Sequence, residues 1–205
     1  CSSCFIGVLE DSIEGIYDCL GRSARISKSS GGMGWDITPV RAAGSYIEGS
    51  NGFSDGLVPM LKQYDQLAQY VNQGGKRKGS IAVYLEPWHA DIFDFLLIRA
   101  NDFEGSDSPR RCRELFTALW VPDLFMKQVE AHGDWYLMDP ADAPELMDLY
   151  GDAFEARYWE LVQANRYMKK VEAMTLWVAI MEAQKDGGTP YICYKDTVNR
   201  KSNHM

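Results

Sequence analysis

Residues 73–89 read QGGKRKGSIAVYLEPWH, and this stretch decides the fold class. Its centre, 81–85, is a short apolar run of the kind that forms a buried strand. A cationic, glycine-rich loop precedes this run. Glycines let a backbone approach a ligand closely, and a guanidinium offers forked hydrogen-bond donors. The stretch therefore predicts a strand beside a loop that suits a nucleotide.

Short apolar runs alternate with helical patterns on both sides of this stretch. Strands are expected at 4–9, 33–37, 81–85, 115–121, 135–138 and 191–194, the last of which closes the chain. Helices are expected at about 12–30, 56–72, 89–98, 122–131, 152–164 and 170–186. The segment 38–55 is typical of a loop, and 99–113 of a mobile polar loop. Because parallel neighbours need crossover connections, the pattern predicts an α/β fold with largely parallel strands.

Composition limits the classes of function. The chain has 205 residues, of which 46% are hydrophobic, enough for one domain-sized core. The net charge of −8 argues against a surface that binds nucleic acid, although a nucleotide can still bind at local basic spots. No run approaches the ~18 apolar residues that cross a bilayer, and no signal segment begins the chain. We therefore expect a cytoplasmic protein without a membrane span.

The cysteines do not indicate a disulfide scaffold. There are five, at positions 1, 4, 19, 112 and 193, an odd number that fits reduced or redox-active thiols. Cys1 and Cys4 form a Cys-x-x-Cys pair, which leaves a redox dithiol, half of a zinc site or coincidence open. We expect no metal site. The chain starts with Cys1 instead of methionine, and we interpret it as an internal fragment of a longer protein.

Several motifs in order resemble one family. They are SSCF at 2–5, GSYI at 44–47, the QGG loop at 73–75 and LEPWH at 85–89. Together they resemble the large, catalytic subunit of class I ribonucleotide reductase. The resemblance implies that residues 1–205 form the first half of a ten-stranded α/β barrel, as one partial domain. The second half-barrel, and an N-terminal ATP cone where relatives have one, are not in this sequence.

The resemblance also implies the chemistry. The family reduces ribonucleoside diphosphates to deoxyribonucleoside diphosphates through a thiyl radical. Cys4 corresponds to one member of the redox dithiol, and its partner lies beyond Met205. Replacing a hydroxyl by hydrogen takes two electrons, which a dithiol supplies when it becomes a disulfide. The fragment alone is expected to be inactive.

Two groups of binding residues follow from the resemblance. Four residues match substrate contacts: Ser3, Gly31, Gly32 and Arg77. Seven match an allosteric site for a deoxynucleoside triphosphate at a dimer interface: Asp11, Ser12, Ile13, Lys28, Arg41, Glu48 and Gly49. A loop that connects the two sites contains Gln73, Gly74, Gly75 and Arg77.

Local chemistry offers a plainer reading of the same residues. Asp11 and Ser12 can simply cap a helix, and the basic side chains can be solvated. Glu48 is a departure from the family, in which small residues are common at this position. Its carboxylate would repel phosphate unless only its backbone is used. His89 and the aromatic residues near it are assigned to the core.

The resemblance also names partners. No cofactor is expected to bind this segment, apart from deoxynucleoside triphosphate or ATP effectors. The expected partners are a second large subunit in a homodimer, a small subunit whose metal centre supplies the radical, and thioredoxin or glutaredoxin. The sequence does not decide between class I and relatives that take the radical from bound adenosylcobalamin. Two alternatives are a non-catalytic nucleotide-binding piece of a split reductase, and a redox or zinc module on Cys1 and Cys4.

Overall fold

A computed structural model describes residues 3–71, 79–99 and 111–203. The strands of the described chain are β1 (Cys4–Val8), β2 (Gly32–Asp36), β3 (Tyr46–Ile47), β4 (Gly52–Phe53), β5 (Ser80–Leu85), β6 (Leu115–Val121), β7 (Asp134–Leu137), β8 (Lys169–Glu172) and β9 (Tyr191–Tyr194). The helices are α1 (Ile13–Lys28), α2 (Leu57–Val71), α3 (Ile92–Leu97), α4 (Asp123–Glu130), the 3-10 helix η1 (Pro144–Met147), α5 (Gly151–Gln163), α6 (Ala173–Gly187) and α7 (Lys195–Lys201). None of the helices in these ranges is long and apolar enough to cross a membrane.

Five parallel strands form the main sheet, in the order β1-β2-β5-β6-β9. Each new strand is added on the same side of the one before it. Right-handed crossovers in one direction place the connecting helices on one face of a sheet. The predicted α/β class with a parallel sheet is therefore confirmed.

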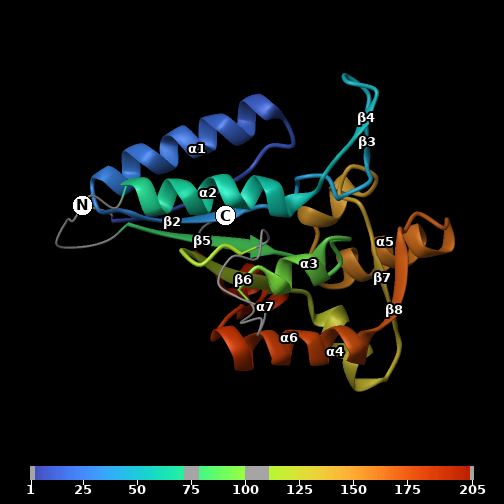
Figure 1. Cartoon of the computed structure of the whole chain (residues 1–205). Helices are drawn as coiled ribbons and strands as arrows, with labels where there is room; N and C mark the ends of the chain where they lie inside the picture. The colour runs from blue at the N-terminus through green and yellow to red at the C-terminus, as the bar shows by residue number, and fades with distance from the viewer. Residues whose placement is uncertain (1–2, 72–78, 100–110, 204–205) are drawn as a thin grey trace.

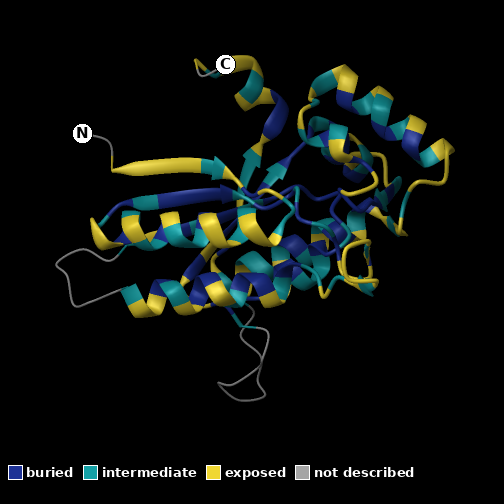
Figure 2. Cartoon of the chain, turned by 90° about the horizontal axis from the view of Figure 1, so that it is seen from above, coloured by how far each residue is buried: buried dark blue, intermediate teal, exposed yellow. Residues whose placement is uncertain are grey.

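The two faces of the sheet differ sharply in burial. On one face, the alternate residues of the central strands are buried beneath helices: Met33, Trp35, Ile81, Val83, Leu85, Leu115, Leu119 and Val121. On the other face, Ile6 is 89% exposed and Val8 59% exposed, and Phe116 and Tyr191 are exposed too. Figure 2 shows β1 as an almost wholly exposed edge strand. Parallel sheets are normally covered on both faces, so this second face is incomplete in the described chain.

Helices α1 and α2 cover the first face side by side (Figure 1). Ser12 begins α1 as its N-cap, since its hydroxyl accepts a hydrogen bond from Gly15 N at 3.0 Å. The Trp35 indole donates to Ser23 Oγ at 2.9 Å and ties α1 to β2. The Tyr64 hydroxyl donates to the carbonyl of Ile16 at 2.9 Å and ties α2 to α1. The position of α1 is thus set by contacts along its length.

A smaller layer packs beside the sheet. Strands β7 and β8 form an antiparallel pair, and α4, α5 and α6 lie around it. Its core is aromatic: Trp135 stacks on Tyr158 with ring centroids 4.6 Å apart, and Phe125 meets Trp135 edge to face at 5.0 Å. The Tyr158 hydroxyl donates to the carbonyl of Tyr136 and accepts from its amide. Burial raises the pKa of Tyr158, so this phenol stays protonated.

Four expected elements need correction. The segment 38–55 contains the β3-β4 hairpin, and the 89–98 helix begins later, at Ile92. The helix expected from 170 begins at Ala173, because its first residues pair with β7 as β8. The segment 191–194 does not end the ordered chain, since α7 follows it directly. Most of the expected mobile loop, 100–110, lies outside the described residues.

Candidate functional site

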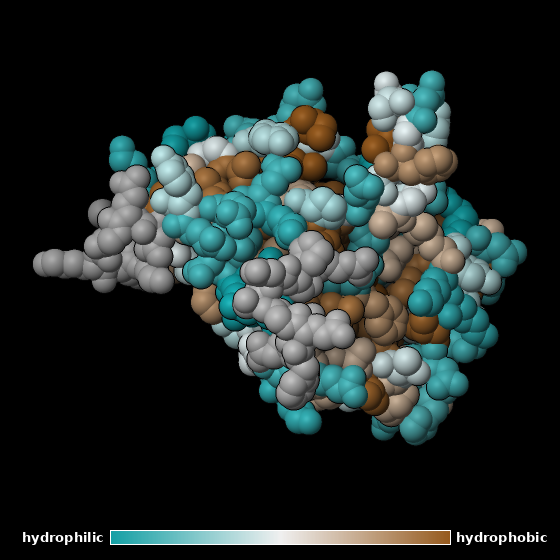
Figure 3. Space-filling view, in the orientation of Figure 1, coloured by the Kyte–Doolittle hydropathy of each residue, from teal (hydrophilic) through white to brown (hydrophobic). Residues whose placement is uncertain are grey.

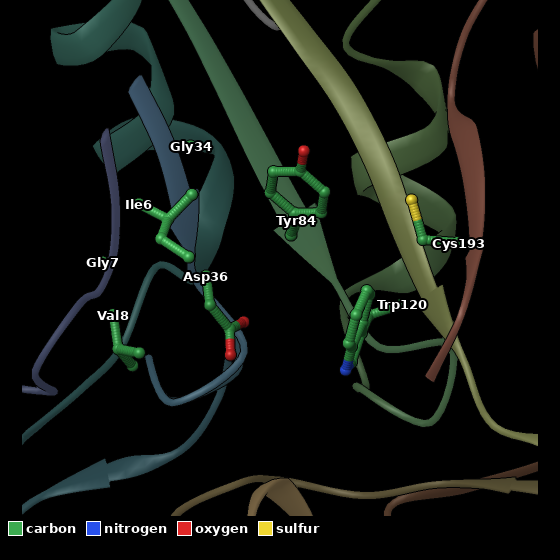
Figure 4. A pocket seen from close by; sticks show the side chains of 8 residues that line it. All are labelled: Ile6, Gly7, Val8, Gly34, Asp36, Tyr84, Trp120 and Cys193. Carbon is green, nitrogen blue, oxygen red and sulfur yellow. The ribbon is translucent and has the colours of Figure 1, made fainter. Parts of the chain in front are cut away.

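A cavity of about 520 Å³ lies on the open face of the main sheet. All five strands contribute to its wall, through Ile6, Gly7, Val8, Gly34, Asp36, Tyr84, Trp120 and Cys193. Figure 4 shows the rings of Tyr84 and Trp120 between Asp36 on one side and Cys193 on the other. Burial raises the pKa of Asp36, which Thr38 opposes by hydrogen bonding. The cavity is thus mainly apolar, with one carboxyl group.

The predicted reducing thiol lies at the beginning of this sheet face. Cys4 is the first residue of β1, and its side chain points to the same face as Ile6 and Val8 because strand side chains alternate. It is exposed, with Ser3 Oγ 4.0 Å from its sulfur. In the parallel register Cys4 lies beside Gly32, whose amide donates to the carbonyl of Ser3 at 2.8 Å. The structure therefore brings Ser3, Cys4 and Gly32 together.

The glycines of this group have a packing reason to be glycine. A Cβ on Gly31 would lie 2.6 Å from Cγ2 of Ile26 and 3.4 Å from the ring of Phe5. A Cβ on Gly32 would lie 3.2 Å from Ser80 Oγ. Close approach of α1 and β5 thus accounts for both residues without a ligand.

The other described cysteines differ from Cys4 in environment. Burial raises the pKa of Cys112 to about 12 and also raises the pKa values of Cys19 and Cys193. Thiols with raised pKa values react slowly, because the thiolate is the nucleophile. Among the four cysteines that the structure describes, Cys4 alone is exposed. Cys1 lies outside the described residues, so the structure does not test the alternative of a redox or zinc module on Cys1 and Cys4.

Six of the seven predicted effector residues gather at the opposite end of the sheet. Asp11 Oδ2 pairs with Arg41 Nε at 2.8 Å, and Asp11 Oδ1 accepts from the Arg41 amide at 3.2 Å. Arg41 Nη1 also donates to the carbonyl of Tyr46, the first residue of the hairpin. Asp11 therefore orients Arg41 instead of capping α1, which Ser12 does. Ile13 follows as the exposed first residue of α1.

Glu48 and Gly49 occupy the exposed turn of the β3-β4 hairpin. Tyr46 and Phe53 form an edge-to-face pair on this hairpin, with ring centroids 6.0 Å apart. In the space-filling view the hairpin projects from the rest of the surface and carries both polar and apolar side chains (Figure 3). The turn thus lies on the same side of the molecule as the Asp11–Arg41 pair.

Lys28 is not part of this group within one chain. It is the last residue of α1, and fifteen residues of helical rise place it roughly 22 Å from Ile13. It lies instead near the end of the sheet where Gly32 begins β2. The loop residues Gln73, Gly74, Gly75 and Arg77 lie outside the described residues.

Sequence reasoning missed a buried ion pair beside the cavity. Lys195 Nζ lies 2.7 Å from Glu86 Oε1, and both side chains are almost completely buried. Lys195 also donates to the carbonyl of Leu146 at 2.9 Å, and the Trp88 indole donates to Glu86 Oε2 at 2.8 Å. The signal in the sequence is a charged residue directly after each of two apolar strands: Glu86 after Ser80–Leu85, and Lys195 after Tyr191–Tyr194. This pair fixes the ends of β5 and β9.

His89 is a structural residue. Its Nε2 donates to the carbonyl of Val40 at 2.8 Å, and its Nδ1 accepts from the Asp91 amide at 3.0 Å. Burial lowers its pKa, so the ring stays neutral with both nitrogens in use. The assignment of this residue to the core is confirmed.

Comparison with known proteins adds a separate line of information. Residues 2–205 match the family described as the barrel domain of ribonucleotide reductase. The chain is 54% identical over 204 residues to the large chain of ribonucleoside-diphosphate reductase from Neurospora crassa, which covers 98% of this chain and 22% of that relative. It is 53% identical over 206 residues to the large subunit from Danio rerio, with coverage of 100% and 26%. For the large subunit from Trypanosoma brucei brucei, identity is 53% over 204 residues, with coverage of 98% and 24%. The chain thus spans about a quarter of the length of these relatives.

Proposed function

Because the chain belongs to the family of ribonucleotide reductase barrel domains, we propose that it forms part of the catalytic barrel of a class I large subunit. Its single parallel sheet, covered on one face, is part of that barrel. The complete subunit reduces ribonucleoside diphosphates to deoxyribonucleoside diphosphates, which are precursors of DNA. The observation that carries this proposal is the exposed thiol of Cys4 at the edge of the open sheet face, beside Ser3 and Gly32.

The reaction needs a reducing thiol near the substrate, and Cys4 supplies one. One ribose C2′–OH bond is replaced by C2′–H, and the hydroxyl leaves as water. Two thiols supply the two electrons and two hydrogens, and they become one disulfide. Cys4 is one of these thiols, and the second lies in a part of the subunit outside this chain. A thiyl radical, generated with the help of a small subunit and its metal centre, opens the reaction. Thioredoxin or glutaredoxin then restores the dithiol.

A single-turnover experiment tests this role of Cys4. The complete subunit is reduced, freed of external reductant, mixed with the small subunit and one ribonucleoside diphosphate, and alkylated after turnover. We expect Cys4 to be alkylated before turnover and protected after it, in proportion to the deoxynucleotide formed. Cys19 and Cys112 should label slowly in both samples, because burial raises their pKa values. Product formation while Cys4 remains fully alkylatable would exclude it as a reductant.

The second part of the proposal is allosteric control. Asp11, Ser12, Ile13 and Arg41, with the turn at Glu48 and Gly49, would hold a deoxynucleoside triphosphate or ATP. The guanidinium of Arg41, already oriented by Asp11, supplies a charge-assisted donor to a phosphate. Ile13 and Tyr17 are exposed apolar residues on α1, which supports a homodimer through this helix. In a two-fold arrangement, Lys28 of one subunit would approach the Asp11 end of the other.

Replacing Arg41 by alanine should weaken effector binding to the complete subunit by about 10–100-fold, the effect of losing one hydrogen bond to a charged group. Equilibrium binding of a deoxynucleoside triphosphate measures this change. Arg22→Ala is the matched control, because Arg22 pairs only with Asp18 on the exposed face of α1 in the described contacts. We expect the control to change affinity by less than about twofold. Equal affinities of wild type and Arg41→Ala would remove Arg41 from the effector site.

The proposal places the protein in the cytoplasm, with small-molecule nucleotides and protein subunits as its partners. The net charge of −8 supports the view that nucleic acid is not one of them.

A further inference from the structure

Helix α1 connects the two ends of the molecule that the proposed function assigns to different ligands. Its first turn follows the Asp11–Arg41 pair, and its last turn contains Ser27. The helix has 16 residues, so it is about 24 Å long. Figure 1 shows it lying along the sheet, with the hairpin near one end and the N-terminus of the chain near the other.

The last turn of α1 presses on the residue that precedes β5. A Cβ added to Gly79 would lie 2.1 Å from Ser27 Oγ, 2.9 Å from Ser27 Cβ and 3.1 Å from Ser27 Cα. Ser27 is only 8% exposed, so it has little room to move away. A real Cβ atom essentially never lies within 3.0 Å of a non-bonded heavy atom. Position 79 therefore requires glycine. The backbone of Gly79 and the side chain of Ser27 are in direct contact.

The contact continues toward the thiol. Ser80 follows Gly79, and its hydroxyl lies 3.2 Å from the place where a Cβ on Gly32 would be. The amide of Gly32 donates to the carbonyl of Ser3, the neighbour of Cys4. Each step in this series is a contact or a hydrogen bond between described residues. Closely packed contacts of this kind pass on a displacement instead of absorbing it.

We infer that Ser27 and Gly79 are positioning residues that couple the effector end of α1 to the substrate and thiol end of the sheet. This inference rests on the proposed function. An effector held at Asp11 and Arg41 shifts or restrains α1 as a body. Ser27 then moves the start of β5 through Gly79, and with it Ser80, Gly32 and Ser3. Neither Ser27 nor Gly79 needs to touch a nucleotide.

A size swap across the contact tests the coupling in the complete subunit with its small subunit. Gly79→Ala adds a methyl group on one side, and Ser27→Gly removes the facing side chain on the other. The readout is the ratio of kcat/KM for two ribonucleoside diphosphates, measured with and without each deoxynucleoside triphosphate. Effector affinity is measured in parallel. Arg22→Ala in the same helix is the control, because its guanidinium pairs with Asp18 and points away from the face that carries Ile13 and Tyr17.

We expect Gly79→Ala to reduce the effector-induced change in substrate preference by about tenfold, within the 5–150-fold range of typical couplings. Effector affinity should change by less than about threefold. The double variant should recover most of the response, because Ser27→Gly vacates the space that the new methyl group needs. Arg22→Ala should respond like the wild type.

The possible negative results distinguish failure of the proposed function from failure of the coupling. A wild type whose preference ignores effectors would overturn the proposed function. A responsive wild type with an equally responsive Gly79→Ala would overturn the coupling alone, as would a double variant that folds without recovering. If Gly79→Ala does not fold, Ser27→Thr adds a methyl group to the other side of the contact, and an unchanged response there would overturn the inference as well.

Discussion

If Cys4 has the role proposed above, replacing it by serine is expected to abolish sustained formation of deoxyribonucleoside diphosphates by the complete subunit. Serine has nearly the same size and cannot give up electrons to form a disulfide, so the substrate radical is left without its reductant. The rate should fall by about a thousandfold or more, the scale on which the loss of one member of a catalytic unit reduces turnover. Because serine and cysteine have nearly the same size, the substitution should leave the free energy of unfolding within about 1 kcal/mol of the wild type.

The control is Cys19→Ala, which removes a buried thiol of α1 that faces the protein core. It should retain turnover, although its stability should fall somewhat. Steady-state assays with thioredoxin and with a small-molecule dithiol distinguish the two possible roles of Cys4. Activity of Cys4→Ser with the dithiol but not with thioredoxin would move Cys4 from the reducing step to the exchange with the protein reductant. Full activity with both would remove it from the reaction.

Replacing Lys195 by methionine should destabilise the complete subunit by about 3–5 kcal/mol, because the carboxylate of Glu86 would then be buried without its partner. Calorimetry or denaturant unfolding measures this loss. Burial raises the pKa of Glu86 to about 7 already, and Lys195 is the largest influence that opposes this rise. In Lys195→Met the folded state therefore binds a proton at Glu86 more tightly than the unfolded chain does. Near pH 5 the folded variant can keep Glu86 protonated and neutral, whereas at pH 8 it must bury the charged carboxylate. The loss of stability should therefore be smaller at about pH 5 than at about pH 8.

Two further variants test whether the loss of stability comes from a buried unpaired charge. The double variant Glu86→Gln with Lys195→Met removes both charges, and its glutamine keeps an oxygen for the Trp88 indole. It should recover about 2 kcal/mol or more relative to Lys195→Met, since no buried charge remains. Arg22→Ala, which breaks an exposed pair with Asp18, should cost less than about 1 kcal/mol. A Lys195→Met variant as stable as Arg22→Ala would mean that water reaches Glu86.

Local sequence patterns predicted the elements that bury a face. The run 115–121 is a central strand with every second residue buried, and 152–164 reads as a helix because apolar residues recur at helical spacing. The same rule failed at Lys169–Glu172, where two lysines and a glutamate are exposed and pairing with β7 alone makes a strand. The hairpin was missed for a similar reason, since two-residue strands leave no alternation to detect.

The candidate site was predictable to the extent that it lies in continuous motifs. Ser3, Cys4 and Gly32 meet because adjacent parallel strands begin in register. Asp11 follows the end of β1 and Arg41 follows the end of β2, and these two strand ends lie side by side in the sheet. Glu86 and Lys195 lie 109 positions apart and meet only when β9 is in place, so no local pattern can reveal them. For the same reason, the approach of Ser27 to Gly79 is visible only in three dimensions.

A single carboxylate, that of Asp196, caps the N-termini of two helices. Asp196 accepts hydrogen bonds from the amide of Asp123, at the start of α4, and from the amide of Gly151, at the start of α5. Asp123 precedes Asp196 by 73 positions. At a synthesis rate of about 5–20 residues per second, α4 leaves the ribosome roughly 4–15 seconds before the group that completes its first turn. Chaperones that bind nascent chains would therefore meet this part of the protein with both helix ends still open to water.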